Sequence, residues 1–189
     1  MTDSVDTIIL HQELAYADVL PISVATLASP PSAPALAAWT ERNLRLLQAC
    51  AVLEELPPGE ADDATPLSAE LQRIDLKVNL LLDMVGVLVA NLQSRPASRS
   101  LRFNAQGLLW EHCNDQIAAD GTAVQIEIYL RDSILYPLVL TGAMRDIGIE
   151  TLASARIDDL PESVAEHIKK LVFRRHRRQI AVARATRRT

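Results

Sequence analysis

Arginines crowd the C-terminal end of the chain, where the run RRHRR lies within KKLVFRRHRRQIAVAR. Clustered guanidinium groups can neutralise phosphates on a nucleic acid, a nucleotide or a membrane surface. The alternative is the solvated end of a helix, where cations favour the helix dipole and pair with an acidic body. Because no aromatic side chains alternate with the arginines to stack on bases, nucleic-acid binding is not favoured. We therefore expect a partner-binding or anion-binding surface at Arg174, Arg175, Arg177 and Arg178.

The charge of the chain is divided unevenly. Residues 161–189 carry nine lysines and arginines against two glutamates, a balance of +7, while the whole chain has a net charge of −5. The rest of the chain must therefore carry −12. Such a basic tail can bind the acidic body of its own chain, a partner or an anion.

No catalytic signature is present in the sequence. It contains neither a nucleophile elbow nor a Walker loop nor a dinucleotide fingerprint, and it has only six glycines. His112 and Cys113 are adjacent, but no further ligands accompany them, so no metal is expected. The two cysteines, Cys50 and Cys113, suit buried thiols in a reducing cytosol. With no signal peptide and no apolar run of the ~20 residues that span a bilayer, we expect a cytoplasmic protein that is not an enzyme and needs no cofactor.

The surfaces that the chain presents to partners must be positioned by its secondary structure, and one long helix is the most distinctive predicted element. It is predicted over residues 66–94, with Thr65 as N-cap, Pro66 in the first turn and Pro96 beyond its end. Its apolar residues follow a spacing of 4, 3, 4, 3 without a break, which is the heptad of a coiled coil. We predict an oligomer interface, here called the seam, formed by Leu67, Leu71, Ile74, Val78, Leu81, Val85, Leu88 and Leu92.

The number of helices in that coiled coil follows from the positions that flank the seam. Leu82, Met84 and Val89 make the flank apolar where a two-stranded zipper would carry charges. A wide apolar face needs more neighbours, so a homotetramer is favoured over a dimer. The alternative is a core helix packed on the helix predicted over residues 34–56. A helix of ~40 Å is longer than a small domain usually buries.

The remaining segments have the composition of short strands. We expect one or two strands in residues 7–26, one over Leu101–Glu111 with a bulge or tight bend at Gly107, and others over 122–131, 137–145 and 149–157. In the third segment, Val124, Ile126, Ile128 and Leu130 should point inward. A basic helix over residues 160–185 closes the chain. The fold class is α+β, with a small antiparallel barrel, two inserted helices and a C-terminal helix.

This order of elements, together with Leu101–Trp110, Gly121–Leu130 and LVFRRHRRQIA, resembles the PilZ family, and in particular its atypical tetramer-forming branch. The resemblance implies first barrel strands in residues 1–28, a helical insertion in residues 29–96 and the remaining strands and basic helix in residues 97–189. It also implies that the inserted heptad helix gathers four barrels in a four-helix coiled coil.

The resemblance further implies cyclic di-GMP as the ligand to consider, because ordinary PilZ domains bind it through RxxxR and (D/N)xSxxG. Here the second motif is degenerate: Gly107 matches, but Arg102 replaces Asp/Asn and Asn104 replaces Ser. A guanine donor that meets Arg102 would face another donor, which opposes ordinary recognition. The RxxxR string at Arg95 and Arg99 lies only a few residues before Arg102 and is interpreted as a connecting loop.

We therefore expect an oligomeric, PilZ-like regulatory or adaptor protein of bacterial signalling, with weak or absent cyclic di-GMP binding and an unidentified protein partner. The resemblance implies a role in motility or virulence. One alternative is a true cyclic di-GMP receptor that uses Arg95, Arg99 and the tail arginines in a non-standard site. A second alternative is nucleic-acid binding through the tail.

Overall fold

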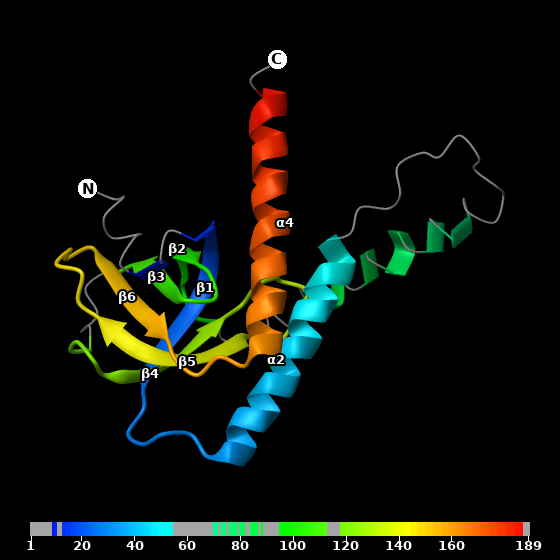
Figure 1. Cartoon of the computed structure of the whole chain (residues 1–189). Helices are drawn as coiled ribbons and strands as arrows, with labels where there is room; N and C mark the ends of the chain where they lie inside the picture. The colour runs from blue at the N-terminus through cyan, green and yellow to red at the C-terminus, as the bar shows by residue number, and fades with distance from the viewer. Residues whose placement is uncertain are drawn as a thin grey trace.

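The computed structural model describes residues 9–10, 13–54, 95–112 and 118–186, and within the heptad segment residues 70–71, 73–74, 76–78, 80–81, 84–86 and 88. Six antiparallel strands close a barrel in the order β1-β2-β3-β6-β5-β4 (Figure 1). Their bounds are Tyr16–Thr26 (β1), Ser98–Phe103 (β2), Gly107–Glu111 (β3), Ala123–Ile128 (β4), Leu138–Arg145 (β5) and Leu152–Ile157 (β6).

The barrel core is mainly aliphatic, as expected from the low aromatic content of 4%. The inward positions of β4 are confirmed, because Val124, Ile126 and Ile128 are fully buried and Leu130 is nearly so. Successive side chains of a strand point to opposite faces, so a period of two is sufficient to define the buried face. Other members of the same core are Leu101, Phe103, Leu108, Leu138, Leu140 and Ala155.

β1 changes partners along its length. Residues 16–21 pair with β2 and residues 22–26 pair with β4. Pro21 lies at this change, where a residue without an N–H is tolerated, and its carbonyl accepts from the Tyr129 amide at 3.0 Å. The predicted strand in residues 7–26 is therefore one strand from Tyr16, whereas Ile9 and Leu10 are helical. Tyr16 and Asp18, in the first half of β1, line a groove together with Leu130 and Arg131, which follow β4.

The predicted single strand over Leu101–Glu111 is wrong, because the segment forms a hairpin of β2 and β3. The turn is built by the buried Asn104, whose Oδ1 accepts from the amides of Gln106 at 2.8 Å and Gly107 at 3.1 Å. Asn side chains favour such turns because they bond to the backbone two or three residues onward. Gly107 begins β3, and a Cβ there would come within 2.6 Å of Ile9 Cγ2.

Two long helices lie beside the barrel: α2 (Ala33–Glu54) and α4 (Glu162–Thr186) (Figure 1). They pack on each other, and α2 also contacts β5. The buried side chains of α2 are Asn43, Leu46, Leu47 and Cys50, and the buried apolar side chains of α4 are Val164, Ile168, Leu171 and Val172. The predicted helices over 34–56 and 160–185 are thus present within two residues at each end, the usual uncertainty of helix bounds.

Asn43 interrupts the apolar stripe of α2 for a structural reason. Its Nδ2 donates to the Val139 carbonyl at 2.6 Å, and its Oδ1 accepts from the Val139 amide at 2.9 Å. The β6 pairing of β5 begins only at Gly142. The side chain of Asn43 therefore replaces a neighbouring strand at Val139 and fixes α2 to the barrel.

Replacing Asn43 by leucine is expected to lower the free energy of unfolding by about 2–3 kcal/mol, because the N–H and C=O of Val139 would be buried without partners. Chemical denaturation monitored by circular dichroism measures this change. Gln48→Leu, on the exposed side of α2, is the matched control and should change stability little. Equal effects of the two substitutions would contradict the role given to Asn43.

The heptad segment follows α2 in the chain. The described residues between 70 and 88 are all helical, and in Figure 1 they extend away from the barrel beyond the end of α2. Leu67 and Leu92 of the predicted seam lie outside the described residues. Within the part of the chain that the structure describes, no helix is both long and apolar enough to cross a membrane.

Candidate assembly surface and arginine groove

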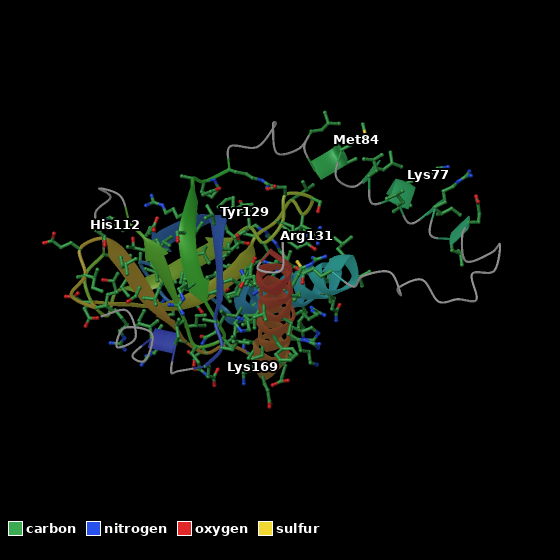
Figure 2. The ribbon with its side chains drawn as sticks, turned by 90° about the horizontal axis from the view of Figure 1, so that it is seen from above. Lys77, Met84, His112, Tyr129, Arg131 and Lys169 are labelled. Carbon is green, nitrogen blue, oxygen red and sulfur yellow. The ribbon has the colours of Figure 1, made fainter. Side chains whose placement is uncertain are left out.

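The described part of the seam is exposed to solvent in the single chain. The relative exposure of its six described side chains ranges from 47% for Val78 to 63% for Leu88. The flanking Met84 is exposed as well. Figure 2 shows Lys77 and Met84 on helical residues that lie apart from the body that carries Tyr129 and Arg131. A contiguous apolar face of this kind marks an interaction surface, because a monomeric protein rarely leaves one uncovered.

Gly86 is the point where this helix meets the barrel domain. It is buried, and a Cβ built on it would lie 2.6 Å from the Ser133 Cα. Gly86 follows Val85 of the seam and therefore occupies heptad position b, on the side away from the a and d residues. The loop after β4 thus contacts the back of the helix, and the seam is left free for other chains.

Arg95, which follows the heptad segment, secures the same loop. Its guanidinium donates to the Asp132 carboxylate at 3.0 Å and to the Asp132 carbonyl at 2.9 Å. It also lies over the Tyr129 ring, 5.4 Å from the centroid. The first arginine of the RxxxR string therefore has a structural role in joining the helix to the barrel.

The other positions of the degenerate nucleotide motifs are separated from Arg95. Arg99 lines a cavity of about 150 Å³ at one end of the barrel, with Trp110 and His112. Its guanidinium donates to the Glu111 carbonyl at 3.4 Å. Arg102 lies on β2 opposite Ala17 and Leu109, while Asn104 and Gly107 build the hairpin turn. The residues that line the cavity of Arg99 do not include Arg95, Arg102, Asn104 or Gly107.

His112, a residue considered for metal binding, lines that same cavity, whereas Cys113 lies outside the described residues. Among the residues that the structure does describe, no three His, Cys, Asp or Glu side chains gather in a way that could hold a metal ion.

The C-terminal arginines line a groove of about 860 Å³ between β1 and the chain beyond β4. The groove shares no lining residue with the cavity that holds Arg99. We call it the arginine groove; its lining residues are Tyr16, Asp18, Glu54, Leu130, Arg131, Arg174, Arg175, Arg177, Arg178, Gln179 and Ala181.

Arg175 forms the buried base of the arginine groove. Its Nε donates to Glu54 at 2.7 Å, and the two side chains are 10% and 8% exposed. A second donor reaches the Leu130 carbonyl at 3.2 Å, and the guanidinium lies over the Tyr16 ring, 4.8 Å from the centroid. One arginine thus joins α4, the end of α2, β1 and the chain beyond β4.

Burial around Arg175 changes the proton affinities of its neighbours. Burial raises the pKa of the Tyr16 hydroxyl to about 12, and its hydrogen bond with Asp18 adds to the shift while Arg175 opposes it. Burial likewise raises the pKa of the Cys50 thiol to about 11, again against the positive charge of Arg175. Both groups are therefore neutral at physiological pH, and Cys50 is a core residue instead of a reactive thiol.

The outer part of the arginine groove carries cations of a different kind. Arg131 donates to the Leu53 carbonyl at 3.4 Å, and the Nε of Arg174 is buried without a partner among the described residues. Arg177 and Arg178 are exposed, and Arg177 lies over the Phe173 ring, 5.8 Å from the centroid. The four predicted arginines of α4 therefore line one groove, but Arg175 is a structural residue and the others face its opening.

Sequence reasoning did not identify the rest of this groove. Glu54 ends α2, Arg131 follows β4, and Tyr16 begins β1, far from α4 in the chain. No spacing relates these residues to the arginine run, because only the packing of α4 against α2 and β1 brings them together. The charge balance of the sequence indicated only that the basic tail could bind the acidic body of its own chain, a partner or an anion.

A closed antiparallel barrel with a long C-terminal helix and a helical insertion after its first strand defines a small β-barrel domain of the PilZ type. The model of one family, described as "Atypical PilZ domain, cyclic di-GMP receptor", matches residues 47–185. The chain belongs to the atypical PilZ domain family.

A solved structure has the same fold. It is a pathogenic protein from Xanthomonas campestris, described as a tetrameric PilZ domain self-assembled via a helical bundle. The two chains are 23% identical and superpose with a TM-score of 0.69, over 95% of this chain and 97% of the other. Among curated proteins, no sequence matches this chain.

Proposed function

We propose that this protein is a non-enzymatic, oligomeric regulatory adaptor, in which the helix predicted over residues 66–94 assembles several barrels into one particle. The observation that carries the proposal is the exposed seam, whose described apolar side chains are 47–63% exposed in the single chain. Leaving these residues in water forgoes the hydrophobic stabilisation that a coiled coil would provide, about 25 cal/mol per Å² of apolar surface. Assembly covers the seam without disturbing the barrel, because Gly86 contacts the barrel domain from the opposite side of the helix.

A homotetramer is the assembly that we propose. The similar protein from Xanthomonas campestris is described as a tetramer held by a helical bundle, which supports four chains. The exposed Met84 beside the seam supports them independently, because a wide apolar face requires more than one neighbouring helix. The domain organisation that accompanies this proposal is a barrel interrupted by a helical insertion over residues 29–96.

Light scattering on the full-length protein tests the proposal. We expect a mass near four times 20.8 kDa at micromolar concentration. A monomeric mass under the same conditions would refute assembly through the seam, and a dimeric mass would refute only the tetramer.

A cyclic di-GMP receptor is the second candidate, favoured by the family's description as a receptor of this nucleotide. We propose weak or absent binding instead, because Arg95 is engaged by Asp132 and Asn104 by its own turn. Calorimetric titration with cyclic di-GMP separates the two candidates. Micromolar binding that is abolished by Arg99→Ala would establish the receptor and refute our proposal for the nucleotide.

The biological setting that we propose is bacterial signalling related to cyclic di-GMP, with motility or virulence as the output. The relation to a protein described as pathogenic supports virulence, and the family supports the signalling context. Comparing a deletion strain with one that carries the variant Val78→Asp/Val85→Asp would show whether the phenotype requires assembly.

A further inference from the structure

We propose that the arginine groove and the adjoining exposed face of α4 bind a carboxylate-rich amphipathic helix of a partner protein. This inference rests on the adaptor function proposed above, and it names the surface and the chemistry by which the adaptor would recognise its partner.

The first argument is the excess of positive charge in the groove. Five arginines line it against two carboxylates, those of Asp18 and Glu54. Glu54 is taken by Arg175, and the Asp18 carboxylate accepts from the Tyr16 hydroxyl and the Val19 amide. Within the described residues, no ion pair joins Arg174, Arg177 or Arg178 to a carboxylate, although the rest of the chain is acidic. Groups that remain uncompensated on an acidic protein are suited to an acidic partner.

The second argument is the apolar stripe beside these cations. Phe173 is 54% exposed and Ile180 is 39% exposed, and with Arg177 between them they follow the 4, 3 spacing of a single helix face. The C-terminal half of α4 contacts β1, because Gln179 donates to the Ala17 carbonyl at 2.9 Å, and only its last turns rise beyond the barrel in Figure 1. A second helix could lie along this stripe, with apolar side chains on Phe173 and Ile180 and acidic ones on the arginines.

The third argument distinguishes a carboxylate ligand from a nucleotide. A nucleobase is recognised by stacking on the flat face of a guanidinium, but one face of Arg175 is covered by Tyr16 and one face of Arg177 by Phe173. A carboxylate instead accepts from the N–H edge of the guanidinium, which the Phe173 ring leaves open on Arg177, whereas the edge of Arg175 is taken by Glu54 and the Leu130 carbonyl. The arrangement therefore favours a peptide carboxylate over a base, and the exposed apolar stripe favours a peptide over a simple anion.

Fluorescence anisotropy with a designed probe tests the proposal on the full-length protein. The probe is a labelled peptide of about 18 residues, or five helical turns, with leucines on one face and glutamates on the other. Its control replaces every glutamate by glutamine. We expect saturable binding of the acidic peptide and at least a tenfold weaker affinity for the glutamine peptide, because charge-assisted hydrogen bonds are lost.

Two protein variants with the same change in charge locate the binding site. Arg177→Gln/Arg178→Gln should weaken binding of the acidic peptide by at least about tenfold, since both cations face the groove. Arg45→Gln/Arg73→Gln removes two exposed arginines outside the groove and should leave the affinity unchanged. Phe173→Ser should weaken binding while keeping every charge, which separates groove recognition from general attraction.

Several outcomes would overturn the proposal: equal losses in the two arginine variants, equal affinity for the two peptides, or no binding up to ~1 mM. Tighter binding of cyclic di-GMP or of phosphatidylserine vesicles at the same arginines would replace the peptide by another ligand. The variant Val78→Asp/Val85→Asp, tested for peptide binding beside the wild type, separates this inference from the proposed assembly. If wild type is a monomer but binds the peptide, assembly fails alone; if wild type is a tetramer without peptide binding, this inference fails alone.

Discussion

Replacing Val78 and Val85 by aspartate is expected to convert the assembled protein into soluble monomers of 20.8 kDa. Both residues occupy position a of the heptad, where each would face its counterparts in the other chains. A carboxylate in a dry seam costs several kcal/mol unless it is paired, and four chains would bring eight such groups together. Light scattering at micromolar concentration measures the loss of mass.

The fold of the single chain should survive this change, because both side chains are already exposed in it. The far-ultraviolet circular dichroism of the barrel domain and its thermal transition should therefore persist, with the loss confined to signal from the inserted helix. Unfolding of the whole protein would instead show that the barrel depends on the assembly.

Leu76 and Leu80 offer a matched control in the same helix. They are as exposed as the seam residues in the single chain, but they occupy heptad positions f and c, away from the a and d residues. Leu76→Asp/Leu80→Asp adds the same charge to the same helix and should leave the mass of the oligomer unchanged. If this variant also produced monomers, the helix would associate through a different face from the one that its heptads predict.

Glu54→Gln is expected to lower the free energy of unfolding by about 3 kcal/mol, the lower part of the range for breaking a buried ion pair. The substitution keeps the shape of the side chain but leaves the charge of Arg175 without a carboxylate at the base of the arginine groove. The remaining hydrogen bond from Arg175 to the Leu130 carbonyl does not neutralise that charge. Urea denaturation at neutral pH measures the change.

An exposed pair of the same helix provides the control. Glu41 and Arg45 form an ion pair one helical turn apart, with both side chains about two-thirds exposed. Glu41→Gln should change stability by less than about 0.5 kcal/mol, because water screens the charges. Equal effects at positions 41 and 54 would contradict the importance of burial.

The double variant Glu54→Leu/Arg175→Met tests whether an apolar pair can replace the stabilising role of this ion pair. Oε2 of Glu54 is buried without a hydrogen-bond partner in the described structure, so the native pair is incompletely satisfied. An apolar pair of similar volume should therefore recover most of the stability lost in Glu54→Gln. No recovery would indicate that the contact of Arg175 with Tyr16 contributes more than its charge pairing with Glu54.

Local periodicity was sufficient to predict most of the elements of this protein. The inward face of β4 follows from alternation over a few residues, and α2 and α4 lie within two residues of the bounds predicted from their own segments. The seam belongs to the same class, because a helix brings residues three and four apart onto one face whatever surrounds it. Its role in assembly remains a prediction, and Leu67 and Leu92 lie outside the described residues.

Prediction from neighbouring residues in the sequence failed where a side chain, instead of the backbone of another strand, forms the hydrogen bonds to backbone groups. Asn104 accepts from amides two and three residues away and so forms a hairpin turn. The sequence predicted a single strand with a bulge or tight bend at Gly107, because a glycine inside a strand pattern is compatible with either. The role of Asn43 could not be predicted either, because its partner Val139 lies 96 residues away.

The sequence by itself determined that a heptad helix interrupts a run of strands and that cations collect at the C-terminus, because both are properties of contiguous segments. Only the tertiary structure decided which arginines are structural: Arg175 bonds to Glu54 across 121 residues, while Arg177 and Arg178 stay exposed. It also decided that the side of the helix opposite the seam, at Gly86, contacts the barrel domain. The physical reason is that burial and ion pairing depend on which elements pack together. The periodicity of one element does not indicate which other element will pack against it.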